Sequence, residues 1–238
     1  MTIRSALFIA HPGHELRLHH WIEQKRPIVY ILTDGSGRKN RSRTRDSREL
    51  LERCGAVAGS IFGRFTDRKL YELLLTRDVE PVAEVVRELT AELRKHKTNV
   101  VIGDSWELYN PTHDLGRIIL DMAVARSGRK IDNYEIADGD VTIELDEAAL
   151  SRKLAALEDY TSMRKETDAI LRREGMSALR FESLRRATPP WAPIRQATYE
   201  QFGADRVAAG HYREVIRYGE HFAPFIAALY KATQPTDA

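Results

Sequence analysis

The sequence predicts an α/β fold, in which a mainly parallel sheet carries helices on both of its faces. Two observations predict it. Short, unbroken apolar runs, typical of strands buried on both faces, alternate with longer segments whose apolar residues recur at helical spacing. The early apolar runs also stop at turn-forming residues. Alternation of this kind is typical of β-α-β units and therefore of a parallel sheet.

The elements of the first half follow from this pattern. Strands are expected at residues 5–10, 28–33 and 99–103, and the first two end at the turn sequences His-Pro-Gly and Asp-Gly-Ser-Gly. Helices are expected at residues 16–24, 47–54, 81–97 and 115–125. Gly55 after the second helix and Pro81 at the start of the third are typical helix boundaries.

The pattern changes after residue 130. Residues 133–136 and 141–145 predict two short strands joined as a hairpin or edge about residues 138–140, and helices are expected over 147–173 and 204–231. Pro189, Pro190 and Pro193 indicate a surface loop between these helices. We therefore expect a three-layer, Rossmann-like α/β domain over residues 1–165, with a C-terminal helical extension of the same domain over 166–238.

Composition excludes several classes of protein. The 238 residues are 42% hydrophobic and 30% charged, which is typical of a soluble globular chain with its own core. A net charge of +2 argues against a nucleic-acid or membrane partner. The single cysteine, Cys54, excludes a disulfide framework and a cysteine-based zinc site. The N-terminal sequence has no signal-peptide pattern, so we expect a cytoplasmic protein.

Histidines follow two of the predicted strands. His11 and His14 come directly after the first strand, and His113 lies ten residues beyond the third. Because the carboxyl ends of parallel strands face the crevice where ligands bind, we expect these histidines at one edge of the sheet. Three protein ligands with one open position are the usual catalytic zinc arrangement. The alternative is that each is a loop residue bonded to water or backbone.

These segments resemble two motifs of a known family. Residues 10–15, Ala-His-Pro-Gly-His-Glu, resemble the Ala-His-Pro-Asp-Asp-Glu signature of the LmbE-like, or PIG-L, zinc-dependent deacetylases. Residues 110–114, Asn-Pro-Thr-His-Asp, resemble their second motif, His-Pro-Asp-His. The resemblance covers roughly residues 5–165. It implies a zinc-dependent hydrolase that removes acetyl groups, mostly from N-acetylglucosamine derivatives.

The departures from the family pattern fall on functional positions. The resemblance implies that His11 and His113 are zinc ligands, and His14 stands where the family has a ligand Asp. Gly13 stands where the family has its general base, and glycine cannot accept a proton. Asn110 replaces the first histidine of the second motif. The sequence thus predicts a three-histidine metal site without the usual base.

Three explanations of the missing base are open. Another carboxylate can serve, and Glu15, Asp34 and Asp114 are the catalytic candidates. Alternatively, zinc alone supplies hydroxide near neutral pH, or the fold is kept without amide hydrolysis. Each carboxylate also has a structural interpretation: Asp114 as the cap of a helix that starts at residue 115 and Asp34 as a turn residue. Asp104 and Glu107 are expected to hold a ligand histidine by hydrogen bonds.

Substrate-binding candidates lie in two loops. Residues 38–48 contain six Lys or Arg and one acid, and in this stretch Arg43 or Arg45 is expected to contact an anionic or polar substrate group. Tyr109 and Asn110 adjoin the second motif, where Tyr109 or the nearby Trp106 can stack on a sugar ring. The alternatives are a solvated basic loop and structural packing.

The leading hypothesis is a zinc-dependent, deacetylase-like hydrolase acting on an N-acylated sugar or a related small molecule. One alternative is a three-histidine metalloenzyme of other chemistry, either ester hydrolysis or a reaction that uses Fe²⁺ in place of Zn²⁺. The other is a metal-stabilised binding protein without turnover. The expected partner is a small molecule, and the sequence leaves a homo-oligomer open.

Overall fold

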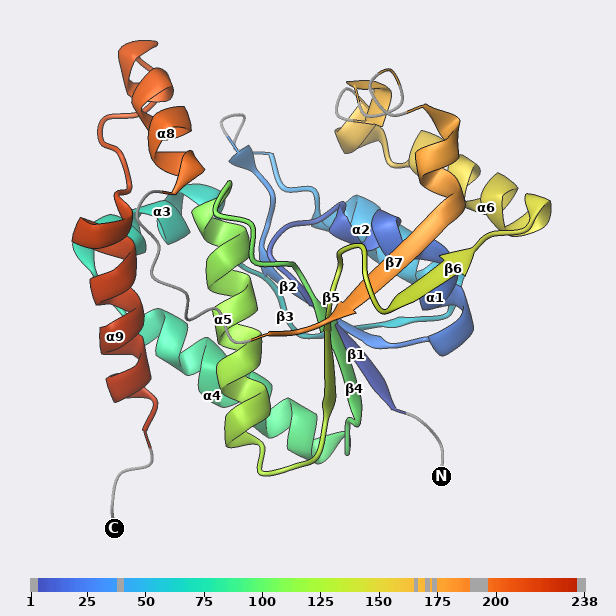
Figure 1. Ribbon diagram of the computed structural model, residues 1–238, viewed down its shortest axis with the longest axis horizontal. Coiled ribbons are helices and arrows are strands. Elements are labelled where there is room, and N and C mark those ends of the chain that lie inside the picture. The colour runs from blue at the N-terminus through green and yellow to red at the C-terminus, as the bar shows by residue number, and fades with distance from the viewer. Residues whose placement is uncertain are drawn as a thin grey trace.

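A computed structural model describes residues 4–37, 41–164, 167–169, 172, 175–188 and 197–234. It contains one seven-stranded sheet of order β3-β2-β1-β4-β5-β7-β6, with helices on both faces (Figure 1). The strands are β1 (Ser5–Ile9), β2 (Ile28–Thr33), β3 (Val57–Phe65), β4 (Val100–Gly103), β5 (Asp132–Glu135), β6 (Val141–Glu144) and β7 (Phe181–Arg186). The helices are α1 (His19–Lys25), α2 (Thr44–Cys54), α3 (Asp67–Thr76), α4 (Glu80–Lys95), α5 (Pro111–Arg126), α6 (Glu147–Asp159), α8 (Thr198–Ala208) and α9 (Ala223–Ala232). Shorter turns are η1 (His14–Leu18), η3 (Thr161–Met163), η4 (Met176–Arg180) and the π turn η5 (Tyr218–Phe222).

The strand order confirms the predicted Rossmann-like α/β class. Strand β1 pairs in parallel with both β2 and β4, and β3 and β5 extend this parallel region on either side. The chain therefore runs outward from β1 in one direction through β2 and β3, and returns to the other side of β1 with β4. The carboxyl ends of β1 and β4 are neighbours at this switch point, which is where ligands bind in sheets of this kind.

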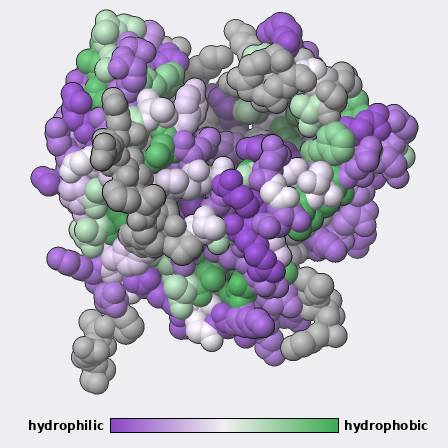
Figure 2. Space-filling view, viewed as in Figure 1, coloured by the Kyte–Doolittle hydropathy of each residue, from purple (hydrophilic) through white to green (hydrophobic). Residues whose placement is uncertain are grey.

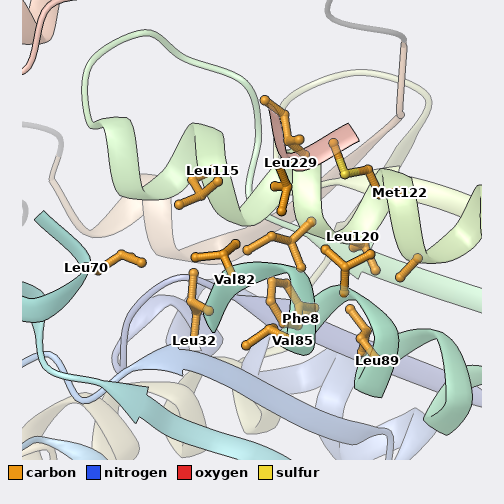
Figure 3. Packing of buried hydrophobic residues seen from close by; sticks show 14 of the residues in the cluster. Phe8, Leu32, Leu70, Val82, Val85, Leu89, Leu115, Leu120, Met122 and Leu229 are labelled. Carbon is orange, nitrogen blue, oxygen red and sulfur yellow. The ribbon is translucent and has the colours of Figure 1, made fainter. Parts of the chain in front are cut away.

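Two apolar cores lie on opposite faces of the sheet. Consecutive side chains of a strand point to opposite faces, so Leu7 and Phe8 of β1 enter different cores. One core lies beneath α3, α4, α5 and α9, where Val85 and Leu120 are among the side chains packed near Phe8 (Figure 3). The other lies beneath α1, α2 and α6. None of the described helices has the length and apolar character needed to cross a bilayer.

Several predicted elements differ from the structure. Strands β5 and β6 do not form a hairpin, because β7 lies between them and pairs antiparallel with both. Strand β3 and helix α3 were not predicted. Helix α6 ends at Asp159, and the expected helix over 204–231 is instead α8 and α9, since Gly210 follows α8 in the left-handed region at φ 68°. The predicted proline loop lies outside the described residues.

A buried ion pair joins α6 to β7, and its carboxylate also binds the start of α1. The Nζ atom of Lys153, which is 2% exposed, donates to Glu182 Oε1 at 3.0 Å. The Glu182 carboxylate also accepts the backbone N–H groups of His20 at 2.9 Å and Trp21 at 2.8 Å. These amides belong to the first turn of α1, where a negative charge stabilises a helix. Since α1 follows η1 directly, Glu182 fixes the far end of the loop that carries His11 and His14.

We expect Glu182→Ala to destabilise the fold by about 3–5 kcal/mol, because it leaves Lys153 buried without its partner and frees two helix amides. Urea unfolding monitored by circular dichroism measures the change. Glu147→Ala is the control, since it breaks only the exposed pair with Arg180 and should cost about 1 kcal/mol or less. Equal losses in the two variants would contradict the assigned role of Glu182.

Candidate metal centre and adjoining cleft

The loops that follow β1 and β4 bring His11, His14 and His113 together. The ring centres are 5.7 Å apart for His11 and His14, 5.1 Å for His11 and His113, and 4.5 Å for His14 and His113. His113 lies in the first turn of α5, which begins two residues earlier at Pro111. The structure therefore places all three predicted ligands at one edge of the sheet.

Carboxylates contact two of these rings. His14 Nδ1 lies 2.6 Å from Asp104 Oδ1, and His113 Nδ1 is hydrogen-bonded to Glu107 Oε1. Burial raises the pKa of Asp104, but His14, His113 and the Ala10 amide together lower it below its usual range. An ionised carboxylate only accepts hydrogen bonds, so the Nδ1 atom of each ring carries a proton, and in the neutral form of the ring Nε2 is the nitrogen with a lone pair. The expected contacts of Asp104 and Glu107 with histidines are confirmed.

The Nδ1 atom of His11 also carries a proton, because a hydroxyl group accepts a hydrogen bond from it. The Thr33 hydroxyl donates to the Ala10 carbonyl at 3.0 Å and therefore accepts from His11 Nδ1, which lies 2.7 Å away. Asp67 Oδ1 lies 3.1 Å from the same nitrogen, so its negative charge also favours a proton on Nδ1. Burial raises the pKa of Asp67, but His11 and its other partners lower it to about 2. The Nε2 atom of His11 faces the Asn110 amide at 3.5 Å.

The three imidazoles fit a metal ion in chemistry and spacing. Neutral rings whose Nδ1–H is bonded to an acceptor are the usual form of metal-binding histidine. Three imidazoles bound to one zinc ion at about 2.0–2.1 Å in tetrahedral geometry have ring centres about 5 Å apart, close to the separations seen here. In the described part of the chain, however, no three such side chains already aim their donor atoms at one point. Binding an ion therefore requires the rings to turn.

Gly13 has no space for the side chain that the family signature places there. Its φ of 107° lies in the region that favours glycine, and a Cβ atom would lie 3.0–3.2 Å from three side-chain atoms of Met163. The Met163 sulfur in turn accepts a hydrogen bond from the Arg43 guanidinium at 2.5 Å. An apolar thioether thus packs against the position of Gly13, beside the histidines.

Glu15 lies behind the histidine loop rather than in front of it. Its carboxylate is fully buried and accepts the Gly13 amide at 2.7 Å, the Ser47 hydroxyl at 2.5 Å and the Tyr160 hydroxyl at 3.0 Å. Burial raises its pKa despite these hydrogen bonds. These contacts tie the loop after β1 to α2 and to the end of α6.

Asp34 and Asp114 are engaged with backbone groups. Asp34 Oδ1 accepts the Ser36 amide at 3.0 Å in a tight turn. Asp114 Oδ1 accepts the amides of Glu107 and Leu108, and burial is the main cause that raises the pKa of Asp114 to about 7. The expectation that Asp114 caps a helix starting at residue 115 is wrong, because α5 starts at Pro111 and its cap is Asn110.

A cleft of about 840 Å³ opens beside His11 and His14, whereas His113 is not among its lining residues. His11, His14, Asn110, Tyr109 and Arg43 line it, together with the thioether of the methionine described above. The catalytic candidates of the sequence analysis, Glu15, Asp34 and Asp114, are not among its lining residues, and neither is Arg45. The side chain of Arg45 is 86% exposed and pairs with Glu49 along α2. Trp106 packs 6.1 Å from Phe222 in the core.

The C-terminal segment forms the opposite wall of this cleft. Its lining residues include Tyr199, Phe202 and Gly203 of α8. The surface is hollowed beside the α8 segment, near the top of the view (Figure 2). Both the Thr198 hydroxyl and the Tyr199 amide donate to the Leu108 carbonyl, at 2.6 and 3.0 Å. The start of α8 is therefore fastened to the loop between β4 and α5.

Two residues of the site, Asp67 and Met163, were not predicted from the sequence. Asp67 follows Thr66, the N-cap of α3, at the end of an unpredicted strand, so its nearness to His11 depends on the position of β3 in the sheet. A helix-start pattern at Thr66 and Asp67 was the available signal. Met163 comes from the turn after α6. No local pattern identifies such a contact, because its partners lie more than a hundred residues away in sequence.

No protein family model and no curated protein sequence matches this chain. Solved structures do resemble it. A triple mutant of the deacetylase of the teicoplanin biosynthetic pathway has a TM-score of 0.54 at 11% identity, over 77% of this chain and 98% of that one. The A40926 pseudoaglycone deacetylase Dbv21 has a TM-score of 0.52 at 15% identity, over 88% and 93%. The conserved protein TT1542 from Thermus thermophilus has a TM-score of 0.51 at 15% identity, over 81% and 100%. At such identities the likeness establishes a shared α/β fold, which two named deacetylases possess.

Proposed function

We propose that this protein is a zinc-dependent hydrolase that removes an acyl group from an N-acylated sugar or a related small molecule. His11, His14 and His113 hold the ion in this proposal. One observation carries it: three imidazoles from two strand-end loops each bind an acceptor through Nδ1, so that Nε2 is the nitrogen left for a metal ion, and two of these rings line a cleft of about 840 Å³. At His11 the ion would replace the 3.5 Å contact between Nε2 and the Asn110 amide. The likeness in fold to two deacetylases supports the same reaction class.

Each group at the cleft has a distinct part in this reaction. Zinc, when bound, polarises an acyl carbonyl and makes water more acidic. Asn110 uses its Oδ1 to accept the Thr112 amide, which leaves the Nδ2 group directed toward His11 and able to donate to an acyl oxygen. Arg43 presents a cation to the cleft, suited to a polar or anionic substituent of the substrate.

A second candidate function is a metal-stabilised binding protein without turnover. The observation that favours it is the replacement of the family base by Gly13, with Met163 packed against that position. The two candidates differ in one measurable property, the release of the acyl group. They share the metal site, so metal content is measured first.

We expect the purified protein to hold about one zinc ion per chain, and His113→Ala to lose it, because two imidazoles bind zinc far more weakly than three. Mass spectrometry of protein without a metal-binding tag measures this. His96→Ala is the control, since His96 lies at the end of α4 beside Glu92. Zinc retained in His113→Ala would contradict the ligand set, and iron found in place of zinc would favour the alternative of a reaction that uses Fe²⁺.

Activity is then measured as acetate release from N-acetylated sugars and from acetate esters. Release of acetate from an amide by the zinc-loaded protein, and its absence in His113→Ala, is the expected result. Release from esters alone would favour the alternative of ester hydrolysis. Zinc-dependent thermal stabilisation by a sugar without any acetate release would favour the binding protein.

Glu107→Gln should weaken zinc binding about 10- to 100-fold, because the amide orients His113 less firmly and no longer favours a protonated Nδ1. Competition with a chromogenic chelator measures the affinity. Glu72→Gln is a matched control, since Glu72 lines the same cleft but makes no contact with the three histidines. An affinity unchanged in both variants would show that Glu107 does not position the ring.

Gly13→Asp should destabilise the fold by more than about 1 kcal/mol, because the residue has a positive φ and its Cβ atom meets Met163. We expect Met163→Ala to relieve part of this loss, so that the two substitutions are not additive. Urea unfolding of both single variants and the double variant completes the cycle. Additive losses would show that Met163 does not obstruct the position, and acetate release gained in the double variant would identify a lapsed deacetylase.

A further inference from the structure

A closed cluster of three polar side chains lies behind the loop that carries His11 and His14. The Ser47 hydroxyl lies 2.5 Å from Glu15 Oε1 and 2.7 Å from the Tyr160 hydroxyl, which itself lies 3.0 Å from the same Glu15 oxygen. The three side chains come from α2, from η1 and from the residue that ends α6. None of them is more than 1% exposed. The reaction proposed above uses none of these groups.

The cluster restrains one backbone amide of the histidine loop. The second oxygen of its carboxylate, Glu15 Oε2, accepts the Gly13 amide at 2.7 Å. Gly13 lies between His11 and His14 and has a φ of 107°. Because glycine has more backbone freedom than any other residue, a loop that turns on it keeps one conformation only where outside groups hold it. Burying three polar groups in an apolar core is costly, and this restraint is a physical reason for doing so.

The segment that begins at Tyr160 contacts Gly13 a second time. The turn η3 follows Tyr160 directly, and the Met163 amide closes it by donating to the Tyr160 carbonyl at 3.1 Å. This turn places the Met163 thioether where a Cβ atom of Gly13 would lie only 3.0–3.2 Å away. Residues 160–163 therefore hold Gly13 at two points, its amide through the carboxylate and its α-carbon through the thioether.

The same segment is fastened to the start of α2. The Ser162 amide donates to Asp46 Oδ2 at 2.9 Å, one residue before Ser47 of the cluster. The guanidinium of Arg43, which precedes α2, donates to the Met163 sulfur at 2.5 Å. Burial raises the pKa of the tyrosine hydroxyl in the cluster, and the adjacent carboxylate adds to the effect, so this hydroxyl keeps its proton. The segment is thus held firmly enough to act as a fixed support for the loop.

We propose that Tyr160 is a positioning residue of the candidate metal centre. Through Glu15 it fixes the Gly13 amide, and with it the loop that carries two of the three histidines. The segment 160–163 thereby controls the metal affinity of the site, although none of the proposed ligands belongs to it. This inference rests on the proposed function for the identity of the ion. The alternative is a cluster that only stabilises the fold.

Tyr160→Phe removes one hydroxyl and leaves the ring in the core. We expect it to weaken zinc binding about tenfold, the lower end of the loss found when a group that orients a metal ligand is removed. Ser47→Ala should have a similar effect, and the double variant should lose little more than either single variant, because both hydroxyls act through one carboxylate. Competition with a chromogenic chelator measures the affinity, and urea unfolding of the same proteins measures stability.

Tyr30→Phe is the matched control. Tyr30 is 1% exposed, and its hydroxyl donates to Glu92 Oε2 at 3.4 Å within the core on the other face of the sheet. This variant also loses a buried tyrosine hydroxyl, so it should lower the free energy of unfolding while leaving zinc affinity unchanged. A Tyr160→Phe protein that behaves in the same way, with lower stability and the zinc affinity of the wild type, would overturn the positioning role.

Amide hydrogen exchange tests the inference on the metal-free protein. We expect Tyr160→Phe to speed exchange in the peptide spanning residues 10–16 about tenfold, because the loop loses part of its restraint. Tyr30→Phe should leave this exchange as in the wild type. Coupling between two sites is reciprocal, so zinc should slow exchange at Ser162 and Met163 of the wild type. Loop exchange that Tyr160→Phe leaves unchanged would overturn the inference.

These two readouts separate the inference from the proposed function. A protein that binds no zinc, but whose loop exchanges faster in Tyr160→Phe, would overturn the hydrolase and leave the positioning of the loop in place. Zinc affinity, loop exchange and acetate release that all remain unchanged in Tyr160→Phe would overturn the positioning role and leave the hydrolase.

Discussion

The candidate site depends on one carboxylate, that of Asp104. One of its oxygens accepts the Ala10 amide at 2.6 Å, and the other accepts His14 Nδ1 at the same distance. Asp104 follows β4 and Ala10 follows β1, so this side chain fixes how two neighbouring parallel strands end. The direction of the chain at Ala10 places His11 against Thr33 at the end of β2. One buried carboxylate therefore holds the ends of two neighbouring strands together and also orients a histidine of the site.

How much of the fold is predictable from sequence depends on how local its causes are. Strands β1, β2 and β4 are buried on both faces, and their unbroken apolar runs identified them. Strand β3 was missed because it lies at an edge and mixes glycine, serine and arginine with its apolar residues, so its pattern is not that of a buried strand. The false hairpin between β5 and β6 has a different cause. Strand β7 lies between them in the sheet, although it comes about forty residues later in the chain. A local sequence pattern cannot predict such a long-range pairing.

The same distinction applies to the site. The three histidines were identifiable because each follows a predicted strand by a short, recognisable segment. The carboxylates Asp104 and Glu107 lie on the loop that also leads to His113, so their contacts with histidines were expected. Glu15 was a catalytic candidate from its place beside His14, yet a 3₁₀ turn carries it to the buried side of the loop, where Ser47 and Tyr160 bind it. Tertiary contacts decide which way the Glu15 side chain points, so its position next to His14 in the sequence does not predict it.

Residues 10–15 lack the two adjacent carboxylates of the signature that they resemble, yet the site is rich in negative charge. In the resembling signature the carboxylates stand at positions 13 and 14, whereas here those positions hold Gly13 and His14. Three carboxylates instead lie behind the imidazoles: Asp67, Asp104 and Glu107, each in contact with an Nδ1 atom. In the proposed centre, an ion bound by three neutral rings would keep its full charge at the cleft, while the balancing anions sit one ring away. Such an arrangement favours polarisation of a neutral acyl group over transfer of a proton to a nearby base.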